Sequence, residues 1–197
     1  MNSNRKSLEC DYVVIGGGIV GGCISYYLSG KNKEVICIDS GEFSGSNSNA
    51  GSIHVQLQSR NFRLNPHLID NLLENLPFYK EAVNAWDRLR LMLNVDLELR
   101  VNGGLMVADN EEQLEFLYKK CQEEKAAGLD VEIIESNKIK KLYPFLSNKV
   151  VGAEFCAHEG KLNPLVANKS LQEVSLRSGV KIMKCETVNH IEFKNNE

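Results

Sequence analysis

Short apolar runs flank a glycine-rich turn in the first forty residues of the chain. Residues 12–15 and 34–39 are apolar segments rich in β-branched side chains, without alternation, which is typical of strands buried on both faces of a parallel sheet. Between them, the turn leads into a helix that we expect to run to about Ser29, with Gly30 as its left-handed cap. Together these elements predict one β–α–β unit.

Helical spacing dominates the next part of the chain. Apolar residues recur at three- and four-residue intervals over 68–76 and again over 83–93, which predicts two helices. Pro77 lies between the two runs, so we expect it to start the second helix or to kink the pair.

The pattern then changes to strict alternation. Apolar and charged residues alternate over 97–101, and Asn102-Gly103 offers a tight turn into a second apolar run at 105–108. This arrangement predicts a β-hairpin, and therefore antiparallel sheet in the middle of the chain.

Helices and strands alternate over the rest of the sequence. Asp109-x-x-Glu112 resembles a capping box and predicts a helix that Gly128 closes, while Asn163-Pro164 predicts the start of another helix that ends at Gly179. The remaining apolar segments predict strands at 131–134, 150–156, 180–184 and 187–193. A short helix capped by Ser136 is predicted between the first two of these strands.

Segments of parallel type thus flank an antiparallel middle. We therefore expect an α/β fold in which one domain is inserted between the two halves of another. The predicted ranges are 1–94 and 158–197 for the outer domain and 95–157 for the inserted one.

Composition and charge exclude several classes of protein. The 197 residues are 43% hydrophobic and 25% charged, as in ordinary globular domains, and a net charge of −3 without a basic stripe argues against nucleic-acid binding. The six cysteines are widely spaced and the four histidines are scattered, so we expect a reducing, cytoplasmic location and no metal site. The apolar stretch 12–28 is interrupted by glycines and is too short for a transmembrane segment.

The glycine-rich turn carries the most informative motif. Gly16-x-Gly18-x-x-Gly21 follows a predicted strand and opens a helix, and a second strand ends in Asp39, eighteen residues after Gly21. The first glycine allows the tight turn, the second lets a pyrophosphate approach the backbone, and the third lets helix and strand pack closely. A glycine turn without a ligand is the alternative, but the strand, the helix and the placed acid together favour a dinucleotide.

The same motif indicates which groups would hold the dinucleotide. The amides of Ile19 and Val20 would point at the phosphates from the positive end of the helix dipole. Asp39 can accept hydrogen bonds from both ribose hydroxyls and would repel a 2′-phosphate. This signal alone does not separate NAD from FAD.

A segment of small polar residues, 44–52, follows the second strand. Its composition alone is that of a flexible surface loop. Its position after the strand favours a loop that wraps a cofactor, because ligands of open α/β sheets bind at that edge.

These residues resemble a known family, the D-amino-acid oxidase superfamily of FAD-dependent oxidoreductases, which includes glycine and sarcosine oxidases and opine oxidase subunits. The resemblance rests on Gly16 to Gly21, on Asp39 and on the loop 45–51. It continues in family order through most of the chain, at 104–108, 142–144, 159–164, 179–180 and 188–191. It implies a Rossmann-like FAD-binding domain with an inserted antiparallel α+β substrate domain.

The resemblance also implies FAD and its contacts. The pyrophosphate would lie on the glycine turn, the ribose on Asp39, the ribityl chain and flavin ring along the 46–52 loop, and the adenine edge on the backbone of Val188. The implied cofactor-binding residues are Gly16, Gly18, Ile19, Val20, Gly21, Asp39, Ser40, Ser46, Asn49, Ala50, Gly51, Ser52 and Val188.

The implied reaction is hydride transfer from the carbon beside an amine nitrogen to the flavin, followed by hydrolysis of the imine. The substrate would be an amino acid or a secondary amine, and the resemblance assigns no catalytic residue. His54 and Arg60 follow the flavin loop, and Arg60 could pair with a substrate carboxylate. The alternative reading, in which both side chains are solvated or structural, is the commoner case for such residues.

Two further functions remain open. A related flavoprotein could oxidise a 2-hydroxy acid or glycerol phosphate, and a non-catalytic FAD-binding fragment or subunit could need a partner chain. Family members carry a second half beyond the equivalent of residue 197. We therefore expect both domains to be incomplete, to expose apolar sheet surface, and to need that half or a hetero-oligomeric partner.

Overall fold

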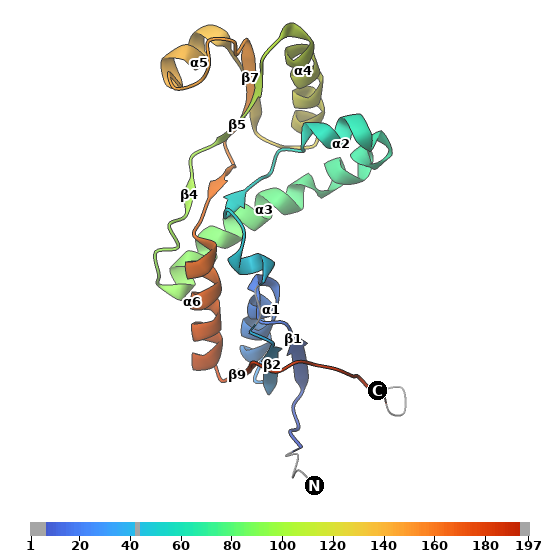
Figure 1. Cartoon of the computed structure of the whole chain (residues 1–197), viewed down its shortest axis with the longest axis vertical. Helices are drawn as coiled ribbons and strands as arrows, with labels where there is room; N and C mark the ends of the chain where they lie inside the picture. Colours follow the sequence, from blue (N-terminus) through green and yellow to red (C-terminus); the bar gives the residue numbers. More distant parts are fainter. Residues whose placement is uncertain (1–6, 42–43, 194–197) are drawn as a thin grey trace. The chain divides into compact units, whose positions relative to one another are not determined.

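The computed structural model describes residues 7–41 and 44–193, which form two compact units. The first unit is built from the described residues of 1–50 and 163–197, and the second from 51–162. Figure 1 shows the elements of each unit, which are described separately below. Among the helices in these described ranges, none is long and apolar enough to cross a membrane.

The first unit holds a three-stranded parallel sheet in the order β1-β2-β9. Its elements are β1 (Tyr12–Ile15), α1 (Ile19–Ser29), β2 (Val35–Asp39), η1 (Gly45–Asn47), α6 (Pro164–Arg177) and β9 (Lys181–Lys184). The predicted β–α–β unit is confirmed, and its small core joins the strands around Val14, Val35, Cys37 and Val180.

Two sequence predictions for this unit are wrong. Gly30 ends α1 in the right-handed region, with φ of −64°, and Asn32 (φ 56°) makes the left-handed turn instead. Asparagine tolerates this conformation because its side chain can hydrogen-bond locally. No strand forms over 187–193, because β9 ends at Lys184 and the left-handed Cys185 (φ 60°) turns the chain out of the sheet.

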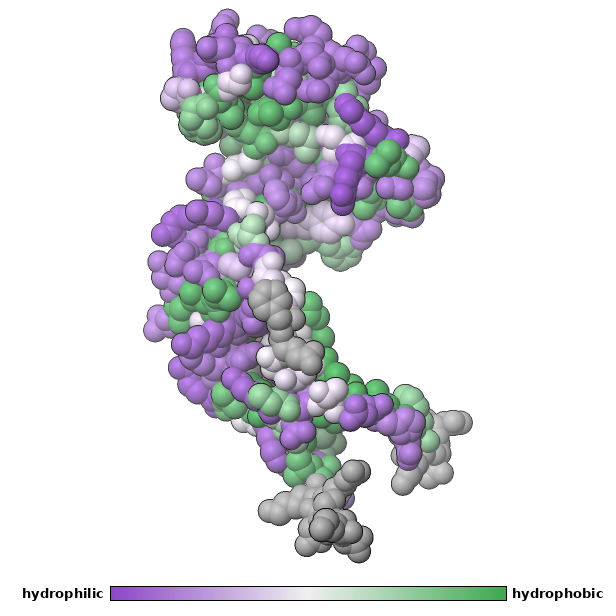
Figure 2. Space-filling model, in the orientation of Figure 1, coloured by the Kyte–Doolittle hydropathy of each residue, from purple (hydrophilic) through white to green (hydrophobic). Residues whose placement is uncertain are grey.

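The expected exposed apolar sheet surface is present on β1, an edge strand of this sheet. Val13 and Ile15 are 55% and 56% exposed. Figure 2 shows apolar surface in green over the part of this unit where β1 lies.

The second unit contains two antiparallel sheets, ordered β3-β8-β4 and β5-β7-β6. Its strands are β3 (Ser52–Ile53), β4 (Arg100–Val101), β5 (Gly104–Ala108), β6 (Val131–Glu135), β7 (Gly152–Cys156) and β8 (Gly160–Lys161). Its helices are α2 (Ser59–Leu64), η2 (Pro66–Leu68), α3 (Ile69–Leu93), α4 (Glu111–Ala126) and α5 (Ser136–Leu142).

The predicted hairpin of the 97–101 and 105–108 segments is wrong. β4 pairs with β8 and β5 pairs with β7, so the two segments run along a later stretch of the chain instead of along each other. Gly103, in the left-handed region (φ 94°), donates its amide to the Glu159 carbonyl and joins the two strands. Asn102-Gly103 therefore separates two consecutive strands, β4 and β5, that belong to different sheets, and does not form a hairpin turn.

The helices of this unit also differ in detail from the prediction. α3 is one helix that contains Pro77, where two were expected. Asn110, one residue after the expected cap, accepts from the amide of Gln113 and caps α4. Glu135, not Ser136, is the N-cap residue of α5. The predicted helix ends at Gly128 and Gly179 and the cap at Asn163 are confirmed.

The structure places the first boundary between the units after residue 50, whereas the sequence predicted it after residue 94. Leu76 and Val83 of α3 are buried in one core with Cys121, Val131 and Cys156. Because α3 buries its apolar side chains among these later elements, contacts assign 51–94 to the second unit.

Candidate functional site

The glycine turn between β1 and α1 is a tight backbone crossing. Gly16 has a φ of 100°, which favours glycine, and its amide donates to the Ile38 carbonyl at 2.8 Å. A Cβ at Gly21 would overlap the Gly16 carbonyl oxygen and lie 3.3 Å from a methyl carbon of Val14. The tight turn expected at the first glycine and the close helix–strand packing expected at the third are therefore present.

The second glycine makes its close approach to a side chain. A Cβ at Gly18 would lie 2.7 Å from the Ser46 hydroxyl oxygen, and that oxygen accepts a hydrogen bond from the Ile19 amide at 3.0 Å. The Ile19 amide, expected to face a phosphate, is thus bonded to Ser46 in this structure. Val20, the next residue of the first turn, has a 69% exposed side chain.

Asp39 lies beside the glycine turn, at the carboxyl end of β2. A Cβ at Gly17 would lie 2.7 Å from a carboxylate oxygen of Asp39, so turn and acid are in close contact. The other oxygen accepts from the Gly41 amide at 3.4 Å. The structure therefore brings the glycine turn and Asp39 together, as the motif predicts, and places Ser46 beside the same turn.

Helix α6 supports this turn with polar side chains that the sequence reasoning missed. Gln172 donates to the Gly17 carbonyl at 2.9 Å, and Asn168 donates to the side-chain oxygen of Asn47, also at 2.9 Å. Asn168 is only 4% exposed, and its own side-chain oxygen has no partner among the described residues. The available signal was the presence of amide side chains on the buried face of a helix.

The other predicted contacts are distributed over both units. The Asn49 side chain donates to the carbonyls of Gly45 and Ser46 and closes the loop on itself. Ser40 and Ala50 lie in the first unit, and Val188 follows β9 in irregular backbone of that unit. Two further predicted residues, Gly51 and Ser52, begin the second unit.

A dinucleotide fits the residues of the turn. At positions 17, 18 and 21 a Cβ would meet neighbouring protein atoms at 2.7 Å or closer, so the turn needs glycine at each of them. The first amides of α1 have no partner within the helix, and they form the positive end of its dipole. The fold and this turn define an α/β dinucleotide-binding unit.

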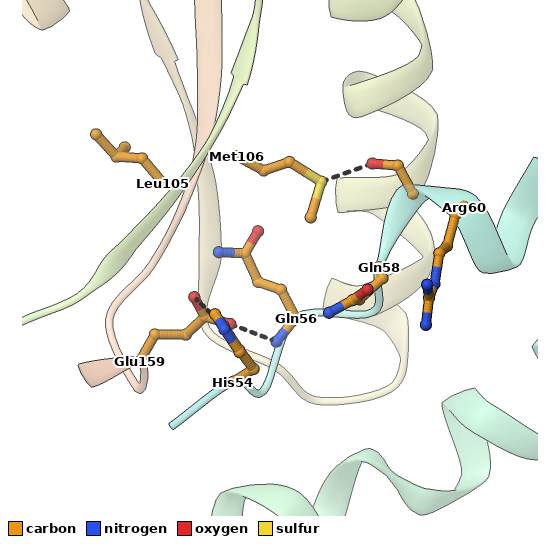
Figure 3. Close-up of a pocket in the computed structure, with 8 residues that line it drawn as sticks. His54, Gln56, Gln58, Arg60, Leu105, Met106 and Glu159 are labelled. Carbon is orange, nitrogen blue, oxygen red and sulfur yellow. Dashed lines mark hydrogen bonds and ion pairs between the residues drawn. The ribbon is translucent and has the colours of Figure 1, made fainter. Parts of the chain in front are cut away.

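The second unit contains a cavity of about 290 Å³, lined by polar and apolar side chains (Figure 3). Its walls are the segment after β3, the start of α2, part of β5, and Glu159 before β8. The lining residues are His54, Gln56, Gln58, Ser59, Arg60, Leu105, Met106 and Glu159. His54 and Arg60, singled out from the sequence, thus line one cavity.

Glu159 organises one wall of this cavity. It is 7% exposed, and one carboxylate oxygen accepts from the amides of Val55 and Gln56, each at 2.9 Å. Its other oxygen lies 3.7 Å from a ring nitrogen of His54. The side-chain oxygen of Gln56 is buried without a partner among the described residues.

Comparison with known proteins identifies the family. Residues 11–197 match the DAO family, described as FAD dependent oxidoreductase, and the chain belongs to this family. FAD is the cofactor of the family.

The chain spans about half the length of the curated relatives that it matches. Glycine oxidase of Bacillus subtilis (strain 168) is 25% identical over 185 residues, which are 91% of this chain and 46% of the relative. An opine oxidase subunit of Rhizobium meliloti is 25% identical over 195 residues, 93% of this chain and 50% of the relative. Glycerol 3-phosphate oxidase of Mycoplasma genitalium is 24% identical over 95% of this chain and 47% of the relative.

Solved structures share the fold. Glycine oxidase from Bacillus cereus ATCC 14579 superposes with a TM-score of 0.77 at 20% identity, over 95% of this chain and 49% of that structure. L-amino acid deaminase from Proteus myxofaciens gives a TM-score of 0.80 at 20% identity, over 99% of this chain and 43% of that structure.

Proposed function

We propose that this chain forms the FAD-binding part of an oxidoreductase that oxidises the C–N bond of an amino acid or a secondary amine. The observation that carries the proposal is the glycine turn closed against Asp39 in a chain of the DAO family. FAD supplies a hydride acceptor when it is bound. The chain's own contribution would be to hold the cofactor and to orient the substrate.

Cofactor binding would fall mainly to the first unit. Amides of α1 would hold the diphosphate, and Asp39 would accept hydrogen bonds from the ribose hydroxyls. The Ser46 hydroxyl, already at the Ile19 amide, would lie beside the diphosphate. The 49–52 loop and Val188 remain predicted contacts of the flavin and the adenine.

Substrate orientation would fall to the cavity of the second unit. Arg60 forms no ion pair with a carboxylate among the described residues, which leaves its guanidinium available for a substrate carboxylate. A cation in this cavity that has no ion pair in the described part of the chain supports a substrate that carries a carboxylate.

A glycerol-phosphate or 2-hydroxy-acid substrate is the second candidate. One relative is a glycerol 3-phosphate oxidase, and an arginine-lined cavity binds phosphate as readily as carboxylate. A non-catalytic subunit is the third, since another relative is a subunit of opine oxidase and the chain covers 50% of it.

Paired substrates distinguish these functions. The whole protein, supplied with FAD, is assayed with amino acids, with the 2-hydroxy acids that match them, and with glycerol 3-phosphate. Release of ammonia or amine supports the proposal, and oxidation of the hydroxy compounds alone supports the second candidate. FAD binding without turnover of any compound supports the third.

An arginine variant tests the role of the cavity. Arg60→Met should raise the KM for a carboxylate substrate by about tenfold to a hundredfold, the effect of losing a charged hydrogen bond of about 1.5–3 kcal/mol. Arg88→Met, which changes an exposed arginine of α3 paired with Glu81, is the matched control. An unchanged KM in Arg60→Met would remove Arg60 from the substrate site.

A further inference from the structure

Three charged side chains are buried in the second unit, away from the surface of the cavity. Lys120 and Glu124 of α4 and Glu154 of β7 have fully buried side chains, each 0% exposed. The Lys120 ammonium donates to Glu154 at 2.7 Å and lies 2.8 Å from a carboxylate oxygen of Glu124. We call these three residues the buried ion cluster.

The buried ion cluster is bonded to the wall of the cavity. The Glu124 oxygen that faces Lys120 also accepts from the Leu57 amide at 2.6 Å. Leu57 lies between Gln56 and Gln58, which both line the cavity. Glu159 binds the two preceding amides, so two buried carboxylates hold this wall by its backbone.

The charges of the cluster do not balance when both carboxylates are ionised. One lysine then faces two glutamates, and each glutamate keeps one buried oxygen without a partner among the described residues. A single proton removes the excess charge and supplies a donor for an unpartnered oxygen. One oxygen of Glu124 accepts from the Leu57 amide and is also paired with Lys120, whereas Glu154 has only Lys120, so Glu154 is the carboxyl that takes the proton.

The environment of Glu154 also favours its protonated form. The pKa of Glu154 is raised from 4.5 to about 7, mainly by burial; the neighbouring Glu124 also raises it, and Lys120 opposes the shift. The partners of Glu154 on the adjacent strands are the uncharged Met106 and Ile133. Two thiols, those of Cys121 and Cys156, also interact with it electrostatically.

We propose that Glu124 is a positioning residue for the cavity and that a proton on Glu154 keeps it in place. With the proton bound, the cluster is neutral and Glu124 holds the Leu57 amide. When the proton leaves, the cluster carries an uncompensated buried charge and the segment 54–58 loosens. The proposal rests on the proposed function only in taking this cavity as the substrate site.

The direction of the pH effect follows from linkage. The anchored state binds the proton more tightly than a loosened state in which Glu154 has its ordinary value, so anchoring is strongest below pH 4.5, weakens as the pH rises toward about 7, and levels off above that. With pKa values of 4.5 and about 7, the anchoring equilibrium falls about tenfold between about pH 6 and about pH 8.5.

Amide hydrogen exchange of the whole protein tests the proposal directly. The protection of the Leu57 amide, corrected for the intrinsic pH dependence of exchange, should fall about tenfold across that pH range. Amides in the middle of β7 serve as the reference, because they report opening of the whole unit. Protection of the Leu57 amide equal in size to that of β7 at each pH would overturn the proposal in favour of global unfolding, because local opening leaves Leu57 less protected than β7.

Two variants and a control complete the test. Glu154→Gln replaces the protonated carboxyl by a permanent donor, so it should keep Leu57 protected and remove the pH dependence. Glu124→Gln removes the charged acceptor and should lower Leu57 protection at every pH. Glu123→Gln, at an exposed position of the same helix, should behave as the wild type.

The outcomes separate this proposal from the proposed function. Two results would overturn the proposal that Glu124 anchors Leu57. The first is wild-type Leu57 protection that does not change between about pH 6 and about pH 8.5, and the second is a Glu154→Gln variant that retains the change. Neither measurement needs flavin or substrate. Failure of the protein to bind FAD would overturn the proposed function and leave this result unaffected.

Discussion

Two adjacent glycines of α1 give a sharp test of the cofactor turn. A Cβ at Gly21 would overlap the backbone carbonyl oxygen of Gly16, whereas a Cβ at Gly22 would meet the Leu171 Cβ at 3.5 Å, an ordinary contact. Gly16 cannot easily move, because its amide is bonded to Ile38. Gly21→Ala should therefore distort the turn, and Gly22→Ala should not.

The magnitudes follow from the two contacts. Both substitutions gain helix propensity, about 1 kcal/mol, because alanine replaces glycine within a helix. Overpacking costs about 1–3 kcal/mol, and only Gly21→Ala incurs it. The gain in propensity is common to both, so the difference between the two variants isolates the steric cost.

Urea unfolding of both variants measures this difference. We expect Gly22→Ala to be at least as stable as the wild type and Gly21→Ala to be less stable than Gly22→Ala by about 1–3 kcal/mol. Gly45→Ala, at a position where a Cβ meets no atom within 4 Å, is a second control. Equal unfolding free energies for the two α1 variants would refute the reasoning.

Three further predictions concern stability and reactivity. Asn163→Ala should lower the unfolding free energy by about 1 kcal/mol in urea titrations, because it removes the acceptor for two amides of α6. Lys120→Met should lower it by about 3–5 kcal/mol in the same assay, because two buried carboxylates lose their cation; a loss below about 1 kcal/mol would contradict this. In the folded protein near about pH 8, a thiol reagent should modify the exposed Cys185 before Cys37 or Cys156, because burial raises the pKa of both buried thiols, that of Cys156 to about 11. Mass spectrometry of the modified peptides checks the order of labelling.

The first unit could be predicted from the sequence because its signals are local. The runs 12–15 and 34–39 and the glycines between them lie within thirty residues and define their own pairing. The glycine positions and the acid at the end of β2 depend on the same short range. For this reason the contact between the turn and Asp39 was predictable.

The second unit was harder to predict because its pairings are long-range. β4 pairs with β8, about sixty residues later, and no local pattern distinguishes this from a hairpin at Asn102-Gly103. Pro77 lies within α3 because tertiary packing of Leu76 and Val83 outweighs the loss of one helical hydrogen bond.

The buried ion cluster shows the same limit for functional residues. Lys120 and Glu124 are four residues apart, a spacing that in a sequence is typical of an exposed ion pair on one face of a helix. The one available signal was Glu154, an acid within the otherwise uncharged strand Gly-Ala-Glu-Phe-Cys. Its partners lie more than twenty residues earlier, so their identity required the structure.

Flavin titration of the purified protein tests the central claim most directly. We expect the chain to bind FAD, and we expect Asp39→Ala to weaken binding by about tenfold to a hundredfold, since it removes a charged acceptor of the ribose hydroxyls, worth about 1.5–3 kcal/mol. Glu173→Ala, at an exposed position of α6, should bind as the wild type does. A protein that binds no FAD, or an Asp39→Ala variant with unchanged affinity, would contradict the account.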